Sequence, residues 1–136
     1  MKGFHFKTPI QLRYSDFDML GHLNSAQYVT FLELGRLLYF QQIKWNLKNI
    51  SNVVASFKID YLNQVIPLNE IEVHIRVSSL GNKSFKMEYL MASPDEAIIY
   101  AKAESTQVCI LKKDNSSTPI PLDARKSITN FEGLKA

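Results

Sequence analysis

Residues 24–43 read NSAQYVTFLELGRLLYFQQI, and this stretch decides the fold. Asn24 or Ser25 can cap a helix with its side-chain oxygen. From Ala26 to about Ile43 the apolar residues cover more than one face, which is typical of a buried helix. Gly35 costs about 1 kcal/mol of helix propensity, so it indicates close packing against another backbone. We therefore predict a long central helix surrounded by other elements.

Strand-like segments flank this helix on both sides. Before it, Phe4 to Tyr14 predicts an extended strand that Pro9 interrupts. After a loop from Asn46 to Asn52, apolar and polar residues alternate with a period of two, the pattern of half-buried strands. This pattern predicts strands over residues 56–61, 70–77, 85–91 and 97–111, a hairpin turn at 81–82 and a short helix over 122–131.

These elements define one fold class. With 136 residues the chain has room for a single hydrophobic core, hence for one domain over residues 1–136. A single apolar helix has to be covered by the sheet, because nothing else in the chain can cover it. We predict an α+β domain in which an antiparallel sheet wraps around one long central helix, with its last three strands in a meander.

Composition narrows the classes of partner. Hydrophobic residues make up 46% and charged residues 21%, as in ordinary globular proteins. The net charge of +3 comes from scattered basic residues, and the tightest cluster is Lys112-Lys113. This distribution argues against nucleic-acid binding. A few basic side chains around a phosphorylated ligand would explain the same bias.

The only cysteine and the apolar segments indicate a cytoplasmic protein. Cys109 lies in an apolar strand pattern, so we predict a small buried hydrophobe, and a disulfide within the chain is excluded. Residues 1–7 lack the apolar region of a signal peptide. No window approaches the roughly 20 apolar residues that span a bilayer, so no membrane contact is expected.

The segment before the helix holds the residues for chemistry. Asp18 is followed by Gly21-His22 and Asn24, just where the helix begins. Free N–H groups and the positive dipole end of a helix favour an anion or a developing oxyanion. A carboxylate beside such donors is the minimum equipment for hydrolysing an activated ester. Asp16 is the rival carboxylate, which would face the same side if the segment stayed extended. No metal-ligand spacing is recognisable.

Residues 13–28, followed by Phe31-Leu32-Glu33, resemble the signature of hotdog-fold acyl thioesterases. The segment is similar to the 4-hydroxybenzoyl-CoA thioesterase-like branch and to acyl-ACP thioesterases, whose signature is roughly Asp-x-x-Gly-His-x-Asn-Asn-x-x-Tyr. The expected strand order matches the hotdog plan to about Leu111, so the resemblance covers most of the chain. It is specific for the fold and weakly specific for the substrate. Ser25 departs from the second Asn of many members.

The resemblance implies a role for each matching residue. Asp18 matches the catalytic carboxylate, acting as a general base for water or as a nucleophile. Gly21 and His22 match the turn whose backbone N–H polarises the thioester carbonyl. Asn24 and Tyr28 match positions that shape the turn and the acyl pocket.

Other residues are expected around the substrate. Tyr28 and Phe31 lie one to two turns into the helix, where they can line an acyl channel that Phe57 closes from the opposite wall. Without a Gly-rich phosphate loop, cofactor phosphates would have to be met by side chains on the polar strand faces, with Lys58, Arg76, Lys83 and Lys86 as candidates. His5 and His74 are expected at the surface. Glu33 is either a polar residue at the core edge or a second active-site carboxylate.

We therefore predict a thioesterase that hydrolyses acyl-CoA or acyl-carrier-protein thioesters without a cofactor. The alternatives are a hotdog hydratase or dehydratase, and a non-catalytic acyl-CoA-binding module. The resemblance implies paired sheets with the site at the junction, so we expect a homodimer or a homotetramer. The sequence leaves open the acyl chain, the carrier and the choice between base and nucleophile for Asp18.

Overall fold

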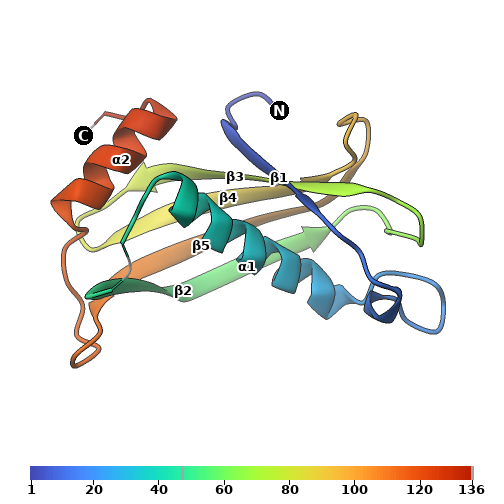
Figure 1. The fold of residues 1–136 in the computed structure, drawn as a ribbon, viewed down its shortest axis with the longest axis horizontal. Coiled ribbons are helices and arrows are strands. Elements are labelled where there is room, and N and C mark those ends of the chain that lie inside the picture. Colours follow the sequence, from blue (N-terminus) through green and yellow to red (C-terminus); the bar gives the residue numbers. More distant parts are fainter. Residues whose placement is uncertain (47, 136) are drawn as a thin grey trace.

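The computed structural model describes residues 1–46 and 48–135. Five antiparallel strands form one sheet in the order β1-β3-β4-β5-β2, and a long helix lies across it (Figure 1). The elements follow along the chain as β1 (Phe6–Ile10), the 3₁₀ turn η1 (Tyr14–Asp16), α1 (Ser25–Gln42), β2 (Ile50–Tyr61), β3 (Ile71–Leu80), β4 (Ser84–Ala92), β5 (Ile99–Leu111) and α2 (Leu122–Glu132). This is the predicted α+β architecture, including the antiparallel meander of β3, β4 and β5.

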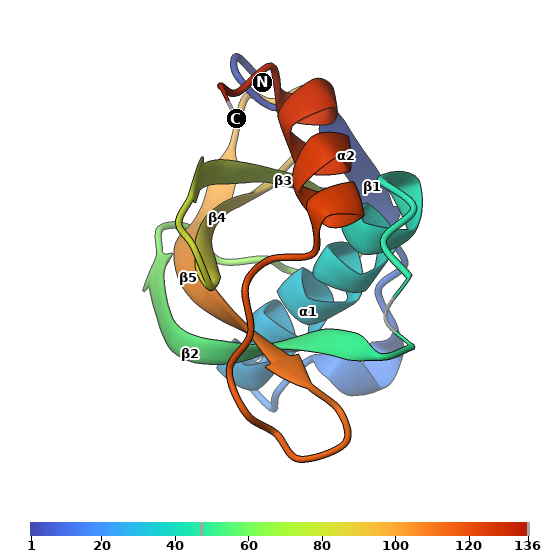
Figure 2. The same ribbon diagram turned by 90° about the vertical axis from the view of Figure 1, so that its left-hand side faces the viewer.

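The curved sheet covers only one side of α1 (Figure 2). Gly35 faces β3 so closely that a Cβ atom there would lie 2.8 Å from Cδ1 of Ile75 and 3.0 Å from Cγ1 of Val73. The packing at Gly35 is close, but the prediction of another backbone as its partner is wrong, since the nearest atoms belong to the side chains of Ile75 and Val73. On the far side of α1, Leu34 and Leu37 are 45% and 49% exposed. The helix is therefore apolar beyond the face that its own sheet covers.

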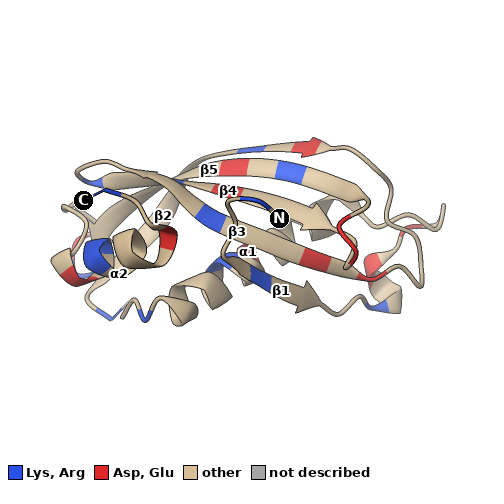
Figure 3. Cartoon of the chain, turned by 90° about the horizontal axis from the view of Figure 1, so that it is seen from above, with Lys and Arg blue, Asp and Glu red and all other residues tan. Residues whose placement is uncertain are grey.

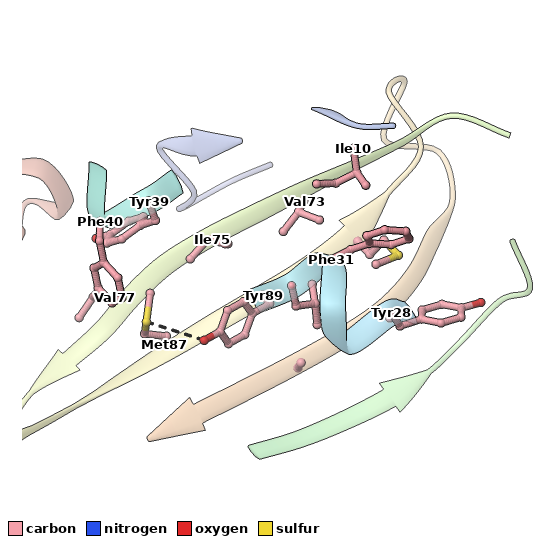
Figure 4. Packing of buried hydrophobic residues seen from close by; sticks show 14 of the residues in the cluster. Ile10, Tyr28, Phe31, Tyr39, Phe40, Val73, Ile75, Val77, Met87 and Tyr89 are labelled. Carbon is pink, nitrogen blue, oxygen red and sulfur yellow. Dashed lines mark hydrogen bonds between the residues drawn. The ribbon is translucent and has the colours of Figure 1, made fainter. Parts of the chain in front are cut away.

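The core fills the space between α1 and the concave face of the sheet (Figure 4). Phe31 and Tyr39 reach into it from α1, and Tyr89 reaches into it from β4. The hydroxyl of Tyr89 is not stranded there, because it lies 2.7 Å from Ser105 Oγ and accepts a bond of 3.3 Å from Arg36. Buried polar groups are stable when they are paired in this way.

Helix α2 packs against one end of the sheet, and its Glu132 carboxylate is bonded to both α1 and β3. Glu132 Oε2 accepts a bond of 2.6 Å from the Tyr39 hydroxyl and one of 2.8 Å from the Val77 N–H. The β3–β4 ladder is irregular between Val77 and Ser79, so Glu132 satisfies an amide at this irregularity. The opposite end of α1 remains available for the loops that precede it.

The two edge strands of the sheet, β1 and β2, differ in length. Strand β1 is shorter than the expected segment 4–14, and Pro9 fits there because an edge strand tolerates a missing donor. Strand β2 is longer than expected, since it begins at Ile50, within the expected loop. A register shift between Val54 and Ser56 interrupts its alternation, which is why the period of two predicted only its second half.

Candidate functional site

A tight loop leads from η1 into α1. Phe17 and Leu23 form an isolated antiparallel bridge, and the residues between them turn back on themselves. The Asp18 N–H donates to the His22 carbonyl at 2.8 Å, and the Gly21 N–H donates to the Asp18 carbonyl at 3.0 Å. Gly21 has a φ of 76°, a left-handed conformation that glycine adopts without strain. The glycine of the motif is therefore required by the shape of this loop.

Asp18 presents an exposed carboxylate at the tip of this loop. Its Oδ1 accepts the N–H groups of Leu20 at 2.9 Å and His22 at 3.1 Å. Within residues 1–46 and 48–135, no donor is bonded to the other oxygen, Oδ2. One oxygen thus fixes the orientation of the side chain, and the other is available to a further donor.

Asp16 has a different environment, although it lies only two residues earlier. Its side chain is completely buried and bonded to Arg13, with Oδ1 2.9 Å from the guanidinium and Oδ2 2.7 Å from the backbone N–H. Burial alone raises the pKa of Asp16, but the hydrogen bonds from Arg13 outweigh it and hold the pKa below its ordinary value. The two carboxylates do not share a face, because the 3₁₀ turn at 14–16 replaces an extended segment.

The start of α1 leaves one backbone donor for a ligand. Asn24 caps the helix, with Oδ1 accepting the Ala26 N–H and the carbonyl accepting the Gln27 N–H, both at 2.9 Å. Leu23 donates to Val65 and Asn24 donates to Asp16. The Ser25 N–H is left without an acceptor among the described residues.

This arrangement bears on the donors that the resemblance assigns. The N–H groups of Gly21 and His22 both donate to Asp18, so their role toward a thioester carbonyl stays a prediction. Ser25 was not predicted as a donor. The sequence signal that could have indicated this donor is the capping position. A helix capped at Asn24 has Ser25 as its first residue, and the cap does not use the N–H of that residue.

A pocket of about 340 Å³ opens beside the first turn of α1, lined by Leu23, Ser25, Tyr28 and residues 61–64. The Tyr28 hydroxyl donates to the Asn63 carbonyl and accepts the Val65 N–H, both at 3.3 Å, so it holds the loop that forms the pocket wall. Tyr61 packs edge-on against Tyr28 with ring centroids 5.0 Å apart, and its hydroxyl donates to the Ser25 carbonyl at 3.0 Å. Tyr61 was not predicted, although it shares the inward face of its strand with Phe57.

The remaining predicted residues lie at different distances from this pocket. Phe31 is in the core, one turn beyond Tyr28 (Figure 4), and Phe57 lies against Tyr89 with centroids 5.9 Å apart. Lys58 points to the opposite face of the sheet from Phe57, because successive strand residues alternate. Lys83 sits at the β3–β4 turn, 3.5 Å from Ser117 Oγ, at the end of the sheet away from Asp18. Within one chain the structure does not bring either lysine to Asp18.

The burial of His5, His74 and Cys109 can be compared with what the sequence predicts. His5 is exposed as predicted, but the expectation for His74 is wrong, since only 2% of it is exposed. The N-terminal segment covers it, with the Phe4 ring edge-on at 6.3 Å, and burial lowers the pKa of His74. Cys109 is buried as predicted, and burial raises the pKa of its thiol to about 11.

Three further features concern Glu33, potential metal ligands and the two helices. Glu33 is exposed and lies 3.9 Å from Arg36, at the edge of the core. No group of three or more potential metal ligands occurs among residues 1–46 and 48–135. Within the same residues, neither helix combines the length and the apolar character needed to cross a membrane.

Comparison with known proteins identifies the class. The fold is that of the hotdog thioesterases: a thioesterase from Thermus thermophilus, solved with coenzyme A and zinc, superposes with a TM-score of 0.85. It is 32% identical, and the match covers 99% of this chain and 100% of that one. The model of the thioesterase-like superfamily matches residues 12–128, so the chain belongs to this superfamily.

Two curated relatives extend the comparison. The long-chain acyl-CoA thioesterase FadM of Escherichia coli (strain K12) is 25% identical over 126 residues, which are 90% of this chain and 96% of that protein. The uncharacterized protein YsmA of Bacillus subtilis (strain 168) is 34% identical over 90 residues. That match spans 65% of this chain and 61% of YsmA.

Proposed function

We propose that this chain hydrolyses acyl-CoA thioesters, with Asp18 as the catalytic carboxylate. The observation that carries the proposal is the position of Asp18, exposed and oriented by two N–H groups, on the loop that leads into a pocket at the start of α1. Similarity to an acyl-CoA thioesterase and to a thioesterase solved with coenzyme A supports the choice of substrate.

The chemistry needs a nucleophile and a place for the oxyanion. Oδ2 of Asp18 either removes a proton from the attacking water or attacks the carbonyl carbon directly. The carbonyl oxygen then becomes an oxyanion, which the Ser25 N–H can stabilise together with the dipole of α1. One such donor is worth about 3 kcal/mol of transition-state energy.

Collapse of the tetrahedral intermediate breaks the C–S bond and releases coenzyme A, whose thiolate takes up a proton. With water as the nucleophile, the acid forms in this step and the proton comes from Asp18. With Asp18 as the nucleophile, this step leaves an acyl anhydride on Asp18, which a water molecule then hydrolyses to the acid.

The acyl group is expected to follow α1 inward from this point. Tyr28 and Tyr61 form the entrance beside Ser25, and Phe31 lies one turn further along the helix. Phe57 is only half-buried, so it lies at the border of the core where an apolar chain can insert. In this proposal Tyr28 has a second task, because its hydroxyl also fixes the loop wall.

We further propose that the working unit is at least a homodimer. Strand β2 has one unpaired edge along 12 residues, and its Val53 and Val54 are 43% and 40% exposed. Open edges of this length are normally paired or covered. Met19 and Leu20, the neighbours of Asp18, are 103% and 79% exposed. A second copy on this side would cover them and shield Asp18 from bulk water.

The test is a panel of acyl-CoA esters with a reagent that detects free thiol. Release of coenzyme A by the wild type and its loss in Asp18→Asn would support the proposal. Tight binding of acyl-CoA without turnover would instead identify a binding module and overturn it. A change in the acyl chain without thiol release would point to a hydratase.

A further inference from the structure

The two peptide groups on either side of Ser25 are held by different partners. In the first, which joins Asn24 to Ser25, the Asn24 carbonyl accepts the Gln27 N–H at 2.9 Å. In the second, which joins Ser25 to Ala26, the Ala26 N–H donates to Asn24 Oδ1 at 2.9 Å. The carbonyl of this second peptide accepts the Tyr61 hydroxyl at 3.0 Å. Within residues 1–46 and 48–135, three of these four groups are thus bonded and the Ser25 N–H is left over.

The bond from Tyr61 ties the first residue of α1 to the sheet. Asn24, Ala26 and Gln27 all belong to the start of α1 or its cap, so their bonds move with the helix. Tyr61 is instead the last residue of β2, 36 positions along the chain from Ser25. A backbone carbonyl has two lone pairs, so the Ser25 carbonyl can accept this hydroxyl in addition to a bond within the helix. The hydroxyl therefore fixes the helix start relative to β2, which the cap alone does not do.

Tyr61 is itself held in place by the sheet. It pairs with Ala101 of β5, and the N–H that follows it, that of Leu62, donates to the Tyr100 carbonyl at 2.9 Å. Its ring packs edge-on against Tyr28 with centroids 5.0 Å apart, which restrains the direction of the hydroxyl. Functional groups on a strand are positioned more precisely than groups on a loop. The sheet thus provides a rigid support for the start of α1.

The charged neighbours of Tyr61 on β2 and β5 lie on the other face of the sheet. Asp60 and Lys102 are paired in register, and their side chains point to the outer face because successive strand residues alternate. Figure 3 shows such charged positions along β5. On the inner face the Ser25 carbonyl meets the neutral hydroxyl of Tyr61. A neutral donor orients the peptide without adding a charge beside the place of the oxyanion.

We infer that Tyr61 is a positioning residue for the hydrolysis, because its hydroxyl aligns the Ser25 N–H with the thioester carbonyl. This rests on the proposed function and deepens it. An oxyanion donor stabilises the transition state when it already points to the place where the charge develops. A displacement of about 1 Å can cost a hundredfold in rate. The hydroxyl acts through Ser25, whereas the ring of Tyr61 borders the pocket.

The first experiment separates the hydroxyl of Tyr61 from its ring. In Tyr61→Phe, kcat should fall about tenfold, the equivalent of one hydrogen bond, with KM unchanged because the ring still borders the pocket. Tyr39→Phe is the matched control, since it removes a hydroxyl that bonds the other end of α1 to Glu132 at 2.6 Å. This control should lower stability and keep the wild-type kcat. A wild-type kcat in Tyr61→Phe, or a change in KM alone, would overturn the inference.

A double-mutant cycle tests whether Tyr61 acts through the Ser25 N–H. Ser25→Pro removes this N–H and keeps the carbonyl that Tyr61 binds. In that background Tyr61→Phe should change kcat by less than about twofold, because residues that act as a unit are not additive. In the Ser25→Ala background, which keeps the N–H, the loss of about tenfold should persist. The same loss in both backgrounds would show that Tyr61 acts independently of this N–H, contrary to the inference.

Hydrogen exchange tests the positioning of the helix start without any substrate. The amides of Ala26 and Gln27 should exchange about tenfold faster in Tyr61→Phe than in the wild type, the effect of one lost hydrogen bond on local opening. Tyr39→Phe should leave both amides unchanged. If the wild type released no thiol from any acyl-CoA, the proposed function would fail while this measurement still decided the role of Tyr61. Unchanged exchange of both amides in Tyr61→Phe would refute that role.

Discussion

Asp16 and Asp18 are separated by one residue, yet Asp16 is completely buried and bonded to Arg13 while Asp18 is exposed at the loop tip. The 3₁₀ turn rotates the first carboxylate inward, and the turn at Gly21 directs the second outward. The same chemical group thus performs two tasks: one stabilises the loop and the other is available for a reaction.

Replacement of each carboxylate by its amide should separate these tasks. Asp18→Asn keeps an oxygen for the N–H groups of Leu20 and His22, so folding should be intact while turnover falls at least about a hundredfold. Asp16→Asn should instead lower the free energy of unfolding by roughly 1–3 kcal/mol, the cost of weakened bonds to a buried charged group. Chemical denaturation and initial rates on both variants check this. Near-normal turnover by Asp18→Asn would contradict its role.

The Ser25 N–H can be removed without disturbing the helix. Proline is favoured at the first helical position, and Asn24 has φ −59° and ψ 133°, a conformation compatible with a following proline. Ser25→Pro should therefore fold normally while kcat falls about a hundredfold or more, as for loss of an oxyanion donor. Ser25→Ala keeps the N–H and should retain kcat. Equal rates for the two variants would exclude this donor.

His74 should make stability depend on pH. Burial places its folded-state pKa below the ordinary 6.5, so the unfolded chain binds the proton more readily. The stabilisation is complete above the unfolded pKa and is lost as the pH falls through the folded pKa. Melting temperature should therefore decrease between about pH 7.5 and pH 5.5. His74→Leu should flatten this slope and His5→Gln should not; an unchanged slope in His74→Leu would refute the assignment.

Cys109 should be silent in thiol assays. Burial raises the pKa of its thiol to about 11, and the thiolate is the reactive form. The native protein should consume no thiol reagent on the timescale of turnover, and denaturant should release one equivalent because the chain has one cysteine. Rapid labelling of Cys109 in the native protein would show that strand β5 opens easily.

A charge on the open strand should prevent association. Val54→Lys places an ammonium group on β2, where lysine blocks edge-to-edge pairing. We expect sedimentation to shift toward the 15.6 kDa monomer. Leu122→Lys, at an exposed position on α2, should leave association unchanged. A Val54→Lys variant that sediments like the wild type would show that copies meet elsewhere.

The elements that could be predicted from the sequence are those whose pattern of apolar and polar residues is visible within one segment of the chain. The strands of the β3–β5 meander show a clear alternation, and α1 is recognisable from its long apolar run, which covers more than one face of the helix. The first half of β2 has Val53 and Val54 on successive positions, so no alternation revealed it. An open edge strand is under less constraint to alternate than a covered one.

The same limit applies to the candidate site: the part encoded in one short segment was predictable, and the contacts between distant segments were not. Asp18 and its loop lie in one short segment, so their spacing is visible in the sequence. Burial of His74 depends on Phe4, which is 70 positions away in the chain, and the pocket wall at Tyr61 depends on the fold. Whether Asn24 or Ser25 caps α1 was open, and that choice determines which N–H is available.

The contact at Gly35 connects the proposed site at the start of α1 with a remote position in the sheet. Gly35 lies ten residues along α1 from Ser25, about 15 Å for a helix rise of 1.5 Å per residue. A methyl group there would lie 2.8 Å from Cδ1 of Ile75, so either the Ile75 side chain or the helix has to shift. A displacement of the helix would reach its first turn, because a helix moves nearly as a rigid rod. Laboratory evolution could therefore retune the geometry of this enzyme by compensating substitutions at Ile75 and Val73, without altering any residue that contacts the substrate.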